Sequence, residues 1–155
     1  MKRIGNLFNK ICDLDNLRMA DVIARRGKKH QYGVQLFDRN AEQNLQELRD
    51  MLLYKEYTTS PYKVFQVKDP KERDVYGLPY YPDRIVHHAV MNYLEPIFVA
   101  SFTADSYSSI KGMGIHAFHR GLKKALHNVP ETQYCLKIDI KKFYPSIDHA
   151  YTAER

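Results

Sequence analysis

The spacing of apolar residues changes along this chain, and that change limits the fold more than any other feature of the sequence. In residues 41–52 an apolar stripe recurs every three or four positions, the period of an amphipathic α-helix, and it consists of Ala41, Leu45, Leu48 and Leu52. After Ser60-Pro61 the pattern becomes that of strands, with β-branched and aromatic residues at 62–67 and 74–78. The sequence therefore predicts a helix-rich α+β fold with one β-hairpin, whose charged tip spans residues 68–73.

The same reading predicts further helices, one loop and one more strand. Asp15 is expected to cap the second helix and Gly27 to end it. Pro96 is expected to end or kink the helix that Pro82-Asp83 opens. Alternation of apolar and polar residues predicts the additional strand, with Asp139 near its end. The expected elements are helices at residues 7–14, 15–26, 82–96 and 115–126, a loop at 27–38 and a strand at 134–140.

Charge points to an anionic partner. The 155 residues carry 24 Lys+Arg and 18 Asp+Glu, a formal net charge of +6. Eight of these cations and only three acids fall within residues 1–30, and the candidates for contact with an RNA template are Arg25, Arg26, Lys28 and Lys29. Twelve Tyr and seven Phe could stack on bases. The simpler interpretation is a solubilising surface with ordinary core aromatics.

Several classes of protein are excluded at this point. The sequence contains no apolar run of membrane-spanning length, so we expect no membrane partner and a cytoplasmic location. Two cysteines form neither a disulfide framework nor a zinc cluster. Six of the seven histidines are candidate metal ligands by their grouping, but their spacing matches no zinc motif: His87, His88, His116, His119, His127 and His149.

The stretch from Leu136 to His149 is the most informative for chemistry. Asp139 follows an apolar strand, and a carboxylate in such a place needs compensation, which a divalent cation provides. Mg²⁺ held there would serve phosphoryl or nucleotidyl transfer. An Asp that forms the following turn, or pairs with Lys137 or Lys141, explains the same residue without a metal.

Three segments, in order, resemble bacterial reverse transcriptases of the group II intron, retron and diversity-generating retroelement types. Asp139-Ile-Lys-Lys-Phe-Tyr144 resembles the first catalytic motif of these RNA-directed DNA polymerases. Upstream, residues 71–89 resemble the fingers hairpin and the helix containing Asp-Arg-Ile-Val, and residues 106–117 resemble the Ser-Tyr-Gly-Phe-Arg segment with its following helix. The resemblance covers residues 60–149.

The resemblance implies a fold and a set of roles. The fold would be the fingers and partial palm of a right-hand polymerase: a basic helical extension (1–58), the fingers (59–130) and the start of the palm (131–155). Asp139 would be the catalytic ligand of two Mg²⁺ ions, and Ile140 would offer its backbone carbonyl. Lys71 and Arg73 would hold the triphosphate of a deoxynucleoside triphosphate, beside the steric gate Tyr144. Lys111 would contact the template.

The sequence departs from this family at a decisive place. Completing the metal site requires a later x-Asp-Asp turn, and no Asp-Asp pair occurs among the 155 residues. We therefore expect a chain that is cut off after its first catalytic motif and is inactive alone. The complete enzyme would use an RNA template and a DNA primer, and an accessory protein is a further candidate partner. The alternatives are a non-catalytic basic RNA-binding module and, more weakly, a nuclease using Asp139, Asp148 and His149. Each of these residues also has a purely structural explanation: Lys71 and Arg73 as solvated charges of the turn, Tyr144 as a core ring, and Asp83-Arg84 as an ion pair at a helix start.

Overall fold

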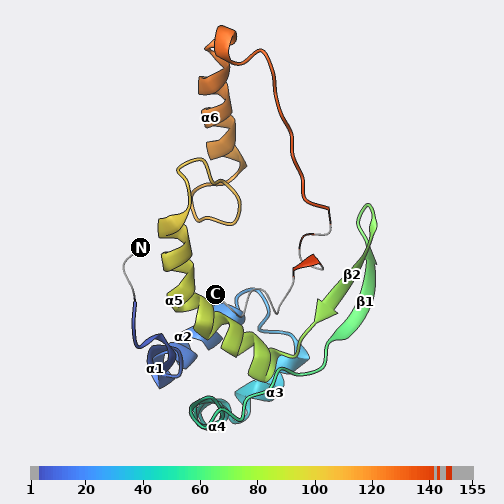
Figure 1. The fold of residues 1–155 in the computed structure, drawn as a ribbon. Helices are drawn as coiled ribbons and strands as arrows, with labels where there is room; N and C mark the ends of the chain where they lie inside the picture. Colours follow the sequence, from blue (N-terminus) through green and yellow to red (C-terminus); the bar gives the residue numbers. More distant parts are fainter. Residues whose placement is uncertain (1–3, 142, 144–145, 148–155) are drawn as a thin grey trace. The chain divides into compact units, whose positions relative to one another are not determined.

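The computed structural model describes residues 4–141, 143 and 146–147. They belong to two compact units, residues 1–102 and residues 103–155 (Figure 1). The elements are α1 (Leu7–Ile11), α2 (Leu14–Ala24), α3 (Tyr32–Asp38), α4 (Ala41–Leu53), β1 (Lys63–Lys68), β2 (Glu72–Gly77), a π-helical turn (Tyr80–Arg84), α5 (Ile85–Ser101), α6 (Ile115–Leu126) and a 3₁₀ turn (Val129–Glu131). The predicted α+β class is confirmed.

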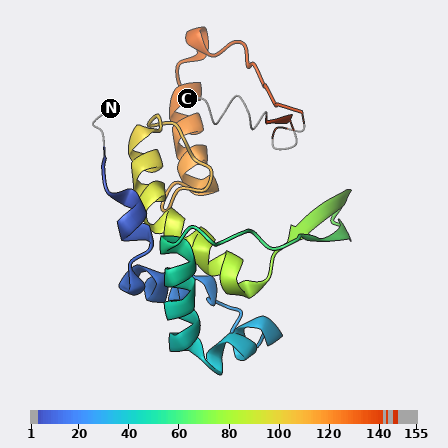
Figure 2. The ribbon, with the colours of Figure 1, turned by 60° about the horizontal axis from the view of Figure 1, so that its bottom comes forward.

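The core of the first unit lies where α2 and α4 pack around the start of α5 (Figure 2). The predicted stripe of α4 faces inward, and Leu45, Leu48 and Leu52 are buried. The first turn of α5 adds Ile85, which is fully buried. Burying a side chain such as Leu48 stabilises the fold by about 1.5–3 kcal/mol, so these helices hold together mainly through apolar contact.

A polar residue also joins α2 to α5. Asn16 is buried on α2, and its side-chain nitrogen donates to the carbonyl oxygens of Ile11 and Ala89, at 3.0 Å each. Its side-chain oxygen accepts from the Asn92 amide nitrogen at 2.8 Å. Because these bonds are directional, Asn16 fixes how α2 sits along α5 in a way that apolar contacts alone do not.

Two local predictions for the N-terminal helices are wrong. Asp13, not Asp15, caps α2: its side chain accepts from the backbone nitrogens of Asp15 and Asn16. The expected loop at 27–38 contains α3, which forms because Val34 and Phe37, three residues apart, are both buried on one side of it. α2 ends at Ala24, two residues before the predicted end at Arg26, and Gly27 lies in the following turns with φ = 69°.

Asp83 anchors the turn that leads into α5. It is buried and accepts hydrogen bonds from the Tyr57 hydroxyl at 2.8 Å and the Ser60 backbone nitrogen at 3.0 Å. Burial pushes the pKa of Asp83 up, but these hydrogen bonds, from Ser60 and Tyr57, outweigh it and leave the pKa below its ordinary value. The predicted ion pair with Arg84 is therefore replaced by hydrogen bonds to the segment that precedes β1.

The hairpin is confirmed and its turn is tighter than expected. β1 and β2 are antiparallel with Phe65 opposite Val75, and the Asp69 nitrogen donates to the Lys71 carbonyl across the turn at 3.2 Å. None of the strand residues is buried. Cross-strand pairing, rather than burial in a core, holds this element.

The helix α5 continues through Pro96 to Ser101, so of the two effects expected of Pro96, an end or a kink, the end is wrong. Proline removes the hydrogen bond that its missing N–H would give to the carbonyl of Asn92. Pro96 itself is exposed, where water can satisfy that carbonyl.

In the second unit, α6 is confirmed and the predicted strand is wrong. Residues 134–140 form no strand, and their apolar side chains are exposed, with Tyr134 at 94%, Leu136 at 83% and Ile138 at 77%. A strand is stabilised by hydrogen bonds to a neighbouring strand, and the described part of this unit contains none. Across the described residues, no helix has the length and apolar content needed to cross a membrane.

Candidate functional site

The two cations predicted to hold a triphosphate lie at the end of the hairpin. Lys71 is in the turn, and Arg73 stands on β2 opposite Val67. Both are exposed. Residues 63–77 contain four Lys+Arg and three Asp+Glu, a net charge of +1, so the hairpin as a whole is only weakly basic. Phosphate binding here would depend on these two side chains rather than on a broad positive field.

Arg25, one of the predicted template contacts, has structural partners instead. Its guanidinium pairs with Asp21 at 2.7 Å and Asp38 at 2.8 Å, and it lies 5.9 Å from the centre of the Phe37 ring. Burial lowers the pKa of Arg25, but hydrogen bonds to Asp21 and Asp38 more than reverse that effect, and the pKa rises. Arg25 thus ties α2 to α3, which leaves Arg26, Lys28 and Lys29 as the candidates for RNA contact in this segment.

The structure brings together two cations that the sequence separates widely. Lys28, in the turns after α2, and Arg84, at the start of α5, line the same small cavity of about 120 Å³. Its other lining residues are Ala24, Gln31, Leu78 and Tyr80. Sequence reasoning missed Arg84, because the adjacent Asp83 suggested an ion pair. Only the packing of α2 on α5 brings Arg84 near Lys28, and no local pattern reports that contact.

A larger groove adjoins the same tyrosine. It has a volume of about 680 Å³, and Tyr80 lines it together with three other aromatic residues, Tyr32, Phe37 and Tyr81. The rings of Tyr80 and Tyr81 lie 5.6 Å and 5.5 Å from that of Phe37, centre to centre. Arg39 and Lys63 add positive charge to its lining. Aromatic faces beside cations are suited to planar anionic ligands.

The residues predicted for catalysis lie in the second unit. Asp139 and Ile140 are exposed in the extended segment 134–140, and Lys111 is exposed in the loop before α6. Tyr144, Asp148 and His149 lie outside the described residues. Within the described ranges, no group of three or more His, Cys, Asp or Glu side chains could hold a metal ion. One carboxylate and one carbonyl do not suffice for a two-ion Mg²⁺ centre.

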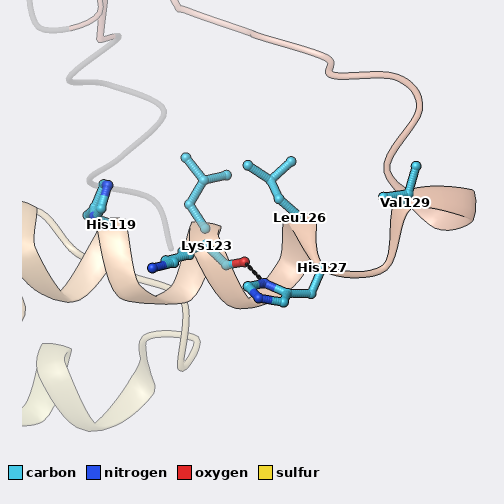
Figure 3. Close-up of a pocket in the computed structure, with 6 residues that line it drawn as sticks. His119, Lys123, Leu126, His127 and Val129 are labelled. Atoms are coloured by element: carbon cyan, nitrogen blue, oxygen red, sulfur yellow. Dashed lines mark hydrogen bonds between the residues drawn. The ribbon is translucent and has the colours of Figure 1, made fainter.

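The second unit also presents a shallow depression along α6 (Figure 3). It is lined by His119, Leu122, Lys123, Leu126, His127 and Val129. The Nδ1 atom of His127 lies 2.6 Å from the Lys123 carbonyl oxygen, which ties this ring to the last turn of the helix. The helix is amphipathic, and none of its residues is buried; Phe118 and Leu122 are each 43% exposed.

Part of this chain is similar to a known protein. No protein-family model matches the sequence. The chain is 30% identical over 108 residues to Protein YkfC of Escherichia coli (strain K12). The matched region covers 68% of this chain and 28% of YkfC. The chain therefore spans less than a third of the length of this relative.

Proposed function

We propose that this chain is the fingers and first palm part of an RNA-directed DNA polymerase of the reverse-transcriptase type. The order of three motifs in the sequence carries the proposal: the charged hairpin, the Ser106-Tyr107 segment before a helix, and Asp139. The hairpin and α6 form where that assignment requires a hairpin and a helix, which adds support. In the complete enzyme, two Mg²⁺ ions would supply the charge stabilisation for nucleotidyl transfer.

The roles of this chain's residues in that reaction are binding and orientation. Lys71 and Arg73 would hold phosphate oxygens of the incoming nucleotide through charge-assisted hydrogen bonds. Asp139 would supply one of the carboxylates at the reacting phosphate. The remaining carboxylates would come from outside the described residues. We expect residues 1–155 alone to bind nucleic acid and not to extend a primer.

A primer-extension assay tests the proposal. A longer protein, in which residues 1–155 continue into a palm carrying the x-Asp-Asp carboxylates, should extend a DNA primer on an RNA template and stop when EDTA removes the metal. Asp139→Asn should reduce the rate by at least about 100-fold, because a charged group at the reacting centre is lost. Glu131→Gln, which removes an exposed carboxylate of the same unit outside the three motifs, should leave the rate unchanged. Normal extension by Asp139→Asn would refute the assignment.

A non-catalytic RNA-binding module is the second candidate function. The exposed cations Arg26 and Lys29 and the adjoining cationic cavity favour it. This candidate requires that the longer protein bind RNA with the same salt dependence as residues 1–155 and show no Mg²⁺-dependent extension.

A further inference from the structure

The cavity between the end of α2 and the turn that leads into α5 has the composition of an anion site. Lys28 and Arg84 supply two positive charges from different parts of the chain, and Gln31 supplies an amide. Both cations are partly buried. A cation that is partly removed from water interacts more strongly with a bound anion than a fully exposed one.

No acid neutralises this cavity among the described residues. The nearby carboxylate of Asp21 is held by Arg25 and by the Tyr80 hydroxyl, and neither Lys28 nor Arg84 forms an ion pair. The neighbouring His88 is affected by this unneutralised positive charge. Its pKa is lowered by burial and, after that, by the positive charges of Arg84, Lys28 and His87.

The aromatic groove adjoins the cavity, because both are lined by Tyr80. The exposed ring of Tyr32, at 73%, offers a face in the groove. A cationic pocket for phosphate next to an aromatic face is the combination by which proteins hold single-stranded nucleic acids. A duplex has its bases stacked inside and cannot use such a face.

We propose that the Lys28–Arg84 cavity and the adjoining groove bind one nucleotide unit of single-stranded RNA, with a backbone phosphate at the two cations and a base against Tyr32. The inference deepens the proposed function, because it places the template strand on the first unit. It concerns binding alone, so it is tested on residues 1–155 without catalysis. Failure of the primer-extension test would leave its outcome unaffected.

Fluorescence anisotropy with a labelled RNA of about 10 nucleotides tests the phosphate contact. The double variant Lys28→Gln/Arg84→Gln should bind at least about tenfold more weakly at low salt, and the slope of log affinity against log salt should become shallower by about 0.7, the value for one phosphate of a single strand. The control Lys10→Gln/Arg49→Gln removes one Lys and one Arg that do not line the cavity. It should lose less than about threefold. Equal losses in the two double variants would overturn the phosphate assignment.

The stacking contact is tested with a matched pair of tyrosines. Tyr32→Ala should weaken binding at least about fivefold without changing the salt slope, since stacking involves no counterion release. Tyr54 is equally exposed, at 74%, and lines neither the groove nor the cavity, so Tyr54→Ala should bind normally. Circular dichroism of each variant checks that the helices remain. Wild-type protein that fails to bind, or that binds a duplex as tightly as the single strand, would overturn the proposal.

Discussion

Replacing Asn16 by alanine should destabilise the first unit by about 2–4 kcal/mol. The variant leaves the carbonyl oxygens of Ile11 and Ala89 without the donor that each now has at 3.0 Å. The bond to Ala89 is buried, and losing it costs roughly 1–3 kcal/mol, while the partly buried bond to Ile11 contributes about 0.5–1.5 kcal/mol. Such a loss is a large share of the 5–15 kcal/mol typical of a folded domain.

Urea unfolding followed by circular dichroism measures this loss, with Asn92→Ala as the matched control. Asn92 donates one bond to the Asn16 side-chain oxygen, so its removal should cost only about 0.5–1.5 kcal/mol. Asn16→Asp should be worse than Asn16→Ala at neutral pH, because a carboxylate cannot donate to two carbonyls and is buried as a charge. A loss for Asn16→Ala no larger than that for Asn92→Ala would refute the reasoning.

Two further predictions concern the core and the turn before α5. Leu48→Ala should cost about 2–5 kcal/mol in urea unfolding, because it leaves a cavity at a fully buried site, whereas Leu53→Ala, on the exposed side of the same helix, should cost less than about 1 kcal/mol. Asp83 has a lowered pKa in the fold, so its stabilising effect is present above the unfolded pKa near 4 and lost as pH falls through the folded value. The stability difference between wild type and Asp83→Asn should therefore shrink on acidification, and a difference that grows would contradict the assigned direction.

The sequence predicted best those elements whose own residues determine them. The Leu45, Leu48 and Leu52 stripe carries the period of α4, and the charged turn between two β-rich runs specifies the hairpin. The prediction of a strand at residues 134–140 was wrong, because the alternation of apolar and polar residues states only which of them would share a face. Whether a strand forms depends on a neighbouring strand that the segment itself cannot supply.

For the candidate site, too, the sequence predicted local properties and not the contacts between distant helices. Positive charge at residues 25–29 was visible in the sequence, but the structure separates its members: Arg25 joins α2 to α3, and Lys28 lines a cavity together with Arg84. That distinction arises from packing between helices far apart in the sequence. The role of Asp139 stays a prediction, because a two-ion centre needs several acids and no group of three or more possible metal ligands occurs among the described residues.

The bonds of Asp83 have a consequence for how the hairpin opens. Asp83, in the turn that follows β2, accepts hydrogen bonds from Tyr57 and Ser60, in the segment that precedes β1. These bonds join the two ends of the hairpin, whereas the strands themselves bury no side chain. The hairpin can therefore lose its ladder while its two ends stay clamped and the helices keep their packing. Amide hydrogen exchange should then divide the first unit into two cooperative parts, with β1 and β2 exchanging through local opening and the inner turns of α2 and α5 only through global unfolding.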